Sequence, residues 1–202
     1  MISPKTPTRP ARGVPGGGAV AQLHTRLQTR QDTPWRLLDE TYDGCTMSGV
    51  PLTRRPGGVN LVTLTIGGND ILQHMDCNPE DYRPEFEQAY RHLLGRIQKL
   101  GIHKSPDTGT VTDAIVVVGN IYAPDWGALS WAPFPADQAR EILGHVNAFI
   151  AEKVRNFGFC LADIHGAFLG NEADYLCYAI EPTFKGASVI ADLFEAAMNQ
   201  SA

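Results

Sequence analysis

The strongest constraint on the fold is a set of short, almost continuously apolar runs separated by helical patterns. Residues 59–66 (VNLVTLTI), 114–118 (AIVVV) and 159–164 (FCLADI) are mostly apolar and rich in β-branched side chains. Runs without polar alternation are typical of strands that are covered on both faces of a parallel sheet. Residues 36–41 are a shorter strand candidate, which ends before the turn signal Asp43-Gly44. We therefore expect parallel strands at 36–41, 59–66, 113–119 and 159–164.

The segments between these runs carry apolar residues at helical spacing. Residues 80–100 are the clearest case, with Phe86, Tyr90, Leu93, Leu94, Ile97 and Leu100 three or four positions apart. Similar patterns cover 19–30, 136–155 and 186–198. Strands alternating with helices predict right-handed crossovers with helices on both faces of the sheet. The fold class is therefore α/β, with three layers in one domain that spans residues 1–202. Residues 1–18 hold four prolines and four glycines, which predicts an irregular segment.

Composition narrows the kinds of protein that this chain can be. A net charge of −5 gives no basic patch of the sort that nucleic-acid binders carry. No apolar run is long enough to span a bilayer, and the first thirty residues lack the apolar core of a signal peptide. The cysteines form no CxxC pair, so neither a zinc site nor a redox motif is indicated (Cys45, Cys77, Cys160 and Cys177).

We accordingly expect a cytoplasmic protein without a metal, an organic cofactor or a nucleic-acid partner, although a secretory signal further upstream is compatible with the sequence. The sequence leaves the oligomeric state open.

The most informative local motif is Gly67-Gly68-Asn69-Asp70, directly after an expected strand. Ligands of open parallel sheets bind at the carboxyl ends of strands. Two glycines allow the backbone to turn sharply and to approach a ligand closely. The Asn69 amide is a neutral donor for a developing oxyanion, and such donors contribute about 2.7–4 kcal/mol to the transition state. The alternative is a plain strand-to-helix turn with Asn69 or Asp70 as the N-cap. GxGxxG is absent, which disfavours dinucleotide binding.

Three segments resemble conserved blocks of the SGNH (GDSL) hydrolases. Residues 61–72 (LVTLTIGGNDIL) resemble the third block, which implies that Asn69 is an oxyanion donor. Residues 37–47 (LLDETYDGCTM) resemble the second, which implies that the Gly44 N–H serves the same oxyanion hole. Residues 180–187 (IEPTFKGA) resemble the fifth block, usually DxxHPN. The resemblance implies a flavodoxin-like sheet and an esterase acting on small-molecule esters of lipids, acyl groups or acetylated sugars. It also implies that Gly44, Asn69 and residues 181–183 surround one cleft.

The sequence departs from this family at the nucleophile. There is no Gly-Asp-Ser, which in the family ends the first strand. Ser3 is the only nearby hydroxyl of the right type, and it has neither the Gly-Asp before it nor a strand to hold it. We expect the first strand to be missing, because the given chain starts at an internal Met with its true start upstream. The alternative is a non-catalytic SGNH-like pseudoenzyme or binding module.

The general base departs from the family as well. Glu181 stands where the family has its His, and Tyr178 where it has Asp. Glu181 is either a base or a carboxylate that interacts with the dipole of the last helix. His165 could replace the missing imidazole, with Asp163 two residues away on the same strand face, or could simply hydrogen-bond a loop. Trp126 and Trp131 could line an acyl or sugar pocket, or cover the end of the sheet.

Overall fold

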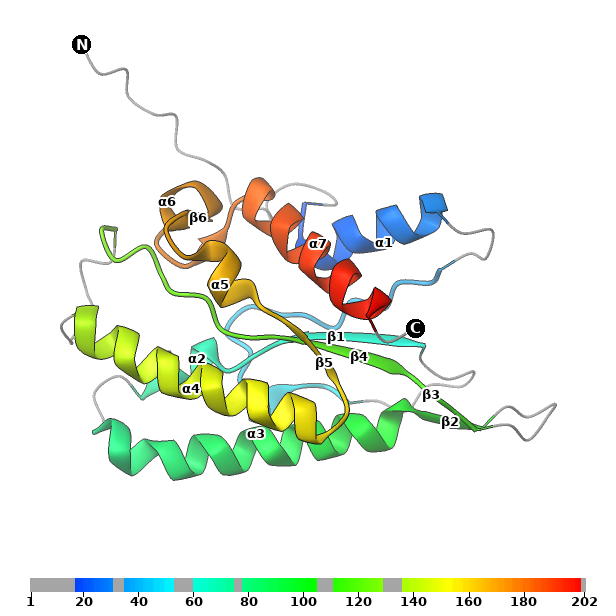
Figure 1. Ribbon diagram of the computed structural model, residues 1–202, viewed down its shortest axis with the longest axis horizontal. Coiled ribbons are helices and arrows are strands. Elements are labelled where there is room, and N and C mark those ends of the chain that lie inside the picture. Colours follow the sequence, from blue (N-terminus) through cyan, green and yellow to red (C-terminus); the bar gives the residue numbers. More distant parts are fainter. Residues whose placement is uncertain are drawn as a thin grey trace, which may run out of the picture.

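A three-stranded parallel sheet forms the centre of the computed structural model (Figure 1). The structure describes residues 17–30, 35–52, 60–74, 78–104, 111–128 and 136–200. The sheet has the order β1-β4-β5, where β1 is Leu61–Thr65, β4 is Ile115–Gly119 and β5 is Cys160–Ala162. Leu61 lies opposite Ile115 and Val117 opposite Cys160, and both pairings are parallel. These pairings confirm the expected α/β fold with a parallel sheet.

Helices cover both faces of the sheet (Figure 1). On one face lie α1 (Ala19–Arg30), α5 (Ile164–Phe168) and α7 (Phe184–Asn199). On the other lie α3 (Pro79–Gly101) and α4 (Ala136–Asn156). The remaining elements are short: η2 (Met47–Gly49), α2 (Gly68–Gln73), β2 (Ile102–Lys104), β3 (Val111–Asp113), α6 (Glu172–Tyr175), β6 (Leu176–Cys177) and β7 (Glu181–Pro182). No described helix is both long enough and apolar enough to span a membrane.

Each face of the sheet has its own hydrophobic core. Because side chains alternate along a strand, Val117 packs with the cluster under α1 and α7, while Val116 and Val118 pack with the cluster over α3 and α4. The expected stripe of α3 is buried, with Tyr90 and Leu94 fully enclosed. The sheet is therefore covered on both sides, as its continuously apolar strands predict.

The expected strand at 36–41 is wrong, since these residues are described and form no strand. Asp39 instead bonds locally: its Oδ1 accepts from the Thr41 backbone N–H at 3.0 Å and from Thr41 Oγ1 at 2.6 Å. Side-chain bonds of this kind compete with a strand ladder. Leu38 is 48% exposed, so its side chain contributes little burial. Within the described residues β1 is an outer strand of the sheet.

The other strands are shorter than the apolar runs suggest. The expected strand 113–119 is divided: Val111–Asp113 pairs antiparallel with β2, and β4 begins only at Ile115. The run 159–164 contributes three residues to β5, because Asp163 becomes the N-cap of α5. Conversely, α7 begins at Phe184, two residues before the expected start, because the Thr183 hydroxyl accepts from the Gly186 N–H and caps it.

Candidate active site

The turn after β1 holds Asn69 at the carboxyl edge of the sheet. Gly67 has a φ of +104° and is the N-cap of α2. A Cβ on Gly67 would lie 3.1 Å from Ile121 Cδ1 and 3.2 Å from Phe86 Cζ. Glycine meets both the conformational and the steric demand of this position. The chain therefore turns at once into the short helix that carries Asn69.

The Asn69 amide lies against the segment that contains Gly44. Asn69 Nδ2 donates to the Cys45 carbonyl oxygen over 3.0 Å. Gly44 precedes that residue in an exposed turn, with a φ of +72°. A side-chain amide has two N–H groups, so Asn69 keeps a donor besides the one that Cys45 accepts. The two segments that resemble the second and third blocks are thus in direct contact.

Asp70 also links these two segments. Both of its carboxylate oxygens lie 3.2 Å from the Met47 backbone nitrogen, which donates to them. Asp70 is buried, and burial raises the pKa of its carboxyl, while the Met47 N–H acts in the opposite direction. A buried carboxylate is costly unless it is hydrogen-bonded. The Met47 contact supplies that bond and fixes the position of the loop from Gly44 to η2.

A second polar network joins the ends of β4 and β5. Asn120 is buried, and its Nδ2 donates to Asp163 Oδ1 over 2.7 Å. The Oδ1 of Asn120 accepts from the His165 backbone N–H at 2.8 Å. Asp163 Oδ1 also accepts from the Gly166 N–H at 2.9 Å. The pKa of Asp163 is lowered, first by the Gly166 N–H and then by the Asn120 amide. This network fixes the start of α5, the helix that carries His165.

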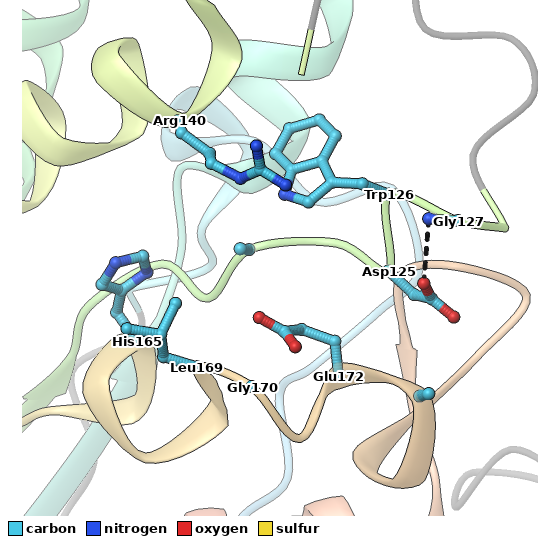
Figure 2. A pocket seen from close by; sticks show the side chains of 10 residues that line it. Asp125, Trp126, Gly127, Arg140, His165, Leu169, Gly170 and Glu172 are labelled. Atoms are coloured by element: carbon cyan, nitrogen blue, oxygen red, sulfur yellow. Dashed lines mark hydrogen bonds between the residues drawn. The ribbon is translucent and has the colours of Figure 1, made fainter. Parts of the chain in front are cut away.

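The expected pairing of Asp163 and His165 on one strand face is wrong. Asp163 is the N-cap of α5 and His165 is inside that helix, because the strand ends at Ala162. The Asp163 carboxylate is engaged with Asn120 and Gly166, as described above. The His165 side chain instead lines a pocket of about 560 Å³ (Figure 2).

Glu181 lies on the small ribbon that β6 and β7 form ahead of α7. The loop before it contacts the segment that follows β4, because Asp125 N donates to the Ala179 carbonyl and Tyr122 Oη to the Ile180 carbonyl, both at 2.8 Å. Burial raises the pKa of Tyr122, and the charge of nearby Glu181 raises it further. Glu181 is half-buried. The segment resembling the fifth block therefore packs beside the loop after β4.

The pocket beside His165 is formed by the loop after β4, α4 and the α5–α6 region. Trp126, Arg140, His165 and Glu172 line it with Asp125 (Figure 2). The Arg140 guanidinium carbon lies 5.7 Å from the Trp126 ring centroid. The lining includes His165 but neither Glu181, Asn69 nor Gly44. The candidate residues thus occupy three places: the Gly44–Asn69 contact, the His165 pocket, and the β6–β7 ribbon that carries Glu181.

Not all of the residues singled out in the sequence can be located. Ser3 and Trp131 lie outside the described residues. Trp126 lines the pocket, which is one of the two positions that the sequence left open for it. Arg140 and Glu172 were missed, because each looks like an ordinary surface charge of a helix. Asp125 follows an apolar strand by a few residues, which is the signal that could have found it. Within the described ranges no three metal-ligating side chains gather into a group.

The class of fold follows from the sheet and its helices. A parallel sheet with helices on both faces is the architecture of the SGNH hydrolases, and the protein has it. The sequence matches no protein-family model and none of the curated proteins compared with it.

Structures described as hydrolases, esterases or lipases are among the solved structures similar to this chain. LAE5, an alpha/beta hydrolase enzyme from the metagenome of Lake Arreo, superimposes with a TM-score of 0.63 at 20% identity, over 92% of this chain and 83% of LAE5. Axe2, an acetylxylan esterase from Geobacillus stearothermophilus, gives 0.63 at 16% identity, over 90% of this chain and 80% of Axe2. A protein described as a GDSL-like lipase, from Parabacteroides merdae, gives 0.51 at 14% identity, over 91% and 69%. At these identities the likeness shows the fold.

Proposed function

We propose that the protein is an ester hydrolase of the SGNH type. The observation that carries the proposal is the 3.0 Å bond between Asn69 Nδ2 and the Cys45 carbonyl. It joins the two segments whose resemblance to the family implies oxyanion donors, Gly44 and Asn69. The fold is also that of structurally similar esterases. The substrate is a carboxylic ester with a lipid, acyl or acetylated-sugar component.

The chemistry assigned to these residues is acyl transfer. A serine hydroxyl attacks the ester carbonyl carbon while a base takes its proton, and the carbonyl electron pair moves onto oxygen. The Gly44 N–H and the second N–H of the Asn69 amide donate to this oxyanion. Collapse breaks the bond to the alcohol, which leaves with the proton from the base. Water then hydrolyses the acyl-serine by the same steps. Glu181 or His165 is the base.

The serine nucleophile in this proposal is assigned from the family resemblance alone. The family carries its serine at the end of a strand that pairs with the counterpart of β1. Within the described residues that side of β1 has no strand partner. Ser3 is the candidate within the sequence itself. Ser48, in η2, is a described hydroxyl close in sequence to Gly44, with its Oγ 3.1 Å from Thr46 Oγ1.

The test compares two forms in p-nitrophenyl acetate hydrolysis: the 202-residue chain, and the same chain extended by the codons in frame before Met1. We expect turnover near that of a heat-inactivated control for the first form, and clear turnover for the second. Turnover by the 202-residue chain that is lost in Ser3→Ala or Ser48→Ala would instead assign the nucleophile to that residue. No turnover by either form, with tributyrin also inert, contradicts the hydrolase and favours a non-catalytic binding module.

A further inference from the structure

The pocket beside His165 contains two ring nitrogens that lack partners. Trp126 Nε1 and His165 Nδ1 are buried and have no hydrogen-bond partner in the described part of the chain. Both residues line the cavity of about 560 Å³. An unsatisfied buried donor costs about 1–3 kcal/mol, and groups of this kind in a native structure call for a partner. A ligand in this cavity is the natural source of one.

The charges around the cavity disfavour an anion as that ligand. Glu172 contributes a carboxylate to the lining, whereas the Asp125 carboxylate is turned toward the Gly127 N–H, which donates to it (Figure 2). Arg140 also lines the cavity, and its Nη1 is already 2.7 Å from Asp137 Oδ1. A phosphate or carboxylate would therefore meet the Glu172 charge and a guanidinium that is already shared with Asp137. A cationic ligand is disfavoured too, because an ammonium cannot accept a bond from the Trp126 N–H.

Hydroxyl groups fit this lining because each both donates and accepts. The Trp126 N–H can only donate, and the Glu172 carboxylate can only accept. Figure 2 shows the Glu172 carboxylate directed into the space between Trp126 and His165. The wall also offers an apolar surface in the Trp126 ring and Leu169. A sugar ring combines hydroxyl edges with apolar C–H faces. The cavity volume lies within the range of about 300–1,000 Å³ that small-molecule sites occupy.

We propose that this pocket binds a sugar ring, whose hydroxyls accept from Trp126 Nε1–H, donate to Glu172 and pair with His165 Nδ1. The proposal that a sugar binds here rests on the pocket alone. That the bound sugar is the alcohol part of the ester rests on the hydrolase proposed above.

The test is calorimetric titration of the 202-residue protein with xylobiose and with cellobiose, beside dodecanoate and inorganic phosphate. We expect saturable binding of at least one disaccharide. Trp126→Phe keeps an aromatic ring but removes the donor, and should weaken binding about five- to tenfold. Trp35→Phe, the same change at a residue packed against α1 and α7, should leave it unchanged.

A second pair keeps the test decisive if Trp126→Phe fails to fold. Glu172→Gln should weaken disaccharide binding, whereas Glu141→Gln, an exposed residue of α4 outside the lining, should not. Absence of disaccharide binding overturns the proposal, as does dodecanoate or phosphate binding that depends on Trp126. Because p-nitrophenyl acetate contains no sugar, its hydrolysis without disaccharide binding contradicts only the sugar site. Disaccharide binding without any ester hydrolysis contradicts only the hydrolase.

Discussion

At the scale of single residues, the site is held by groups that each make more than one contact. Asp163 Oδ1 accepts from both the Gly166 N–H and Asn120 Nδ2, and these bonds lower the pKa of its carboxyl. A group whose pKa is lower in the folded state adds stability above its unfolded pKa. That stability is lost as the pH falls through the folded value. Asp163 therefore contributes most at neutral pH and nothing once it is protonated in both states.

Asp163→Ala should lower the free energy of unfolding by about 1 kcal/mol at pH 7, since it removes the N-cap of α5. The difference from the unmutated protein should shrink as the pH is taken below 3.8, the ordinary pKa of an aspartate. Urea unfolding at a series of pH values measures this difference in unfolding free energy. Asp81→Ala, in the exposed first turn of α3, is the control and should show a smaller change at pH 7. An Asp163 effect that is the same at pH 3 and pH 7 argues against this role.

Substitution by alanine should have opposite effects on stability at Gly67 and at Gly144. Gly67→Ala should destabilise the protein by more than about 1 kcal/mol, because Gly67 has a positive φ and its Cβ would press on Ile121 and Phe86. Gly144 lies in α4 with nothing within 4 Å of an added Cβ, so Gly144→Ala should stabilise by about 0.5–1 kcal/mol. Thermal unfolding distinguishes them, and equal shifts in Tm would refute the turn geometry.

At the scale of elements, the sequence predicted the strands and helices that bury apolar side chains. The stripe of α3 and the core residues of β4 are where the pattern put them. It failed at residues 36–41, where the Asp39–Thr41 side-chain bonds take the place of a ladder. It also overlooked the cap at Asp163, so His165 was assigned to a strand instead of a helix. Apolar periodicity reports burial, whereas these outcomes depend on local side-chain hydrogen bonds, from Thr41 to Asp39 and from the Gly166 N–H to Asp163.

Two leucine substitutions test this description of the elements. Leu94 is completely buried between α3 and the sheet, so Leu94→Ala should cost about 2–5 kcal/mol of unfolding free energy. Leu38 is 48% exposed in the segment that forms no strand, so Leu38→Ala should change the unfolding free energy by less than about 0.5 kcal/mol. Chemical denaturation gives both values. A large loss at Leu38 would indicate that residues 36–41 are packed as a buried strand after all.

At the scale of the whole molecule, loops from distant parts of the chain meet at the carboxyl edge of the sheet. Asn69 holds the Gly44 loop, the Gly67 turn lies against Ile121, and Tyr122 bonds the loop before Glu181. The resemblance singled out the segments of Gly44 and Asn69 from the sequence, and these two segments are in contact. The sequence singled out Trp126 and His165 of the sugar pocket but not Arg140 or Glu172, which line it from two helices that are distant in the sequence.

The identity of the base is a question for the whole site, and kcat/KM of two glutamine variants answers it. If His165 is the base, His165→Gln should remove most of the activity of the active form, whereas Glu181→Gln should leave most of it. If Glu181 is the base, Glu181→Gln should abolish turnover and His165→Gln should not. Full activity in both variants contradicts either assignment.

The central claim is that Gly44 and Asn69 form one oxyanion hole, and the most direct measurement is kcat/KM for p-nitrophenyl acetate in Asn69→Ala. The comparison uses whichever form of the protein turns over this ester, with Asn171→Ala, an exposed asparagine outside both sites, as the matched control. Loss of the Asn69 donor should reduce kcat/KM about 10² to 10³-fold with little change in KM, because the bond forms only in the transition state. The Asn171 variant should keep full activity. Turnover by Asn69→Ala equal to that of the control would contradict the account.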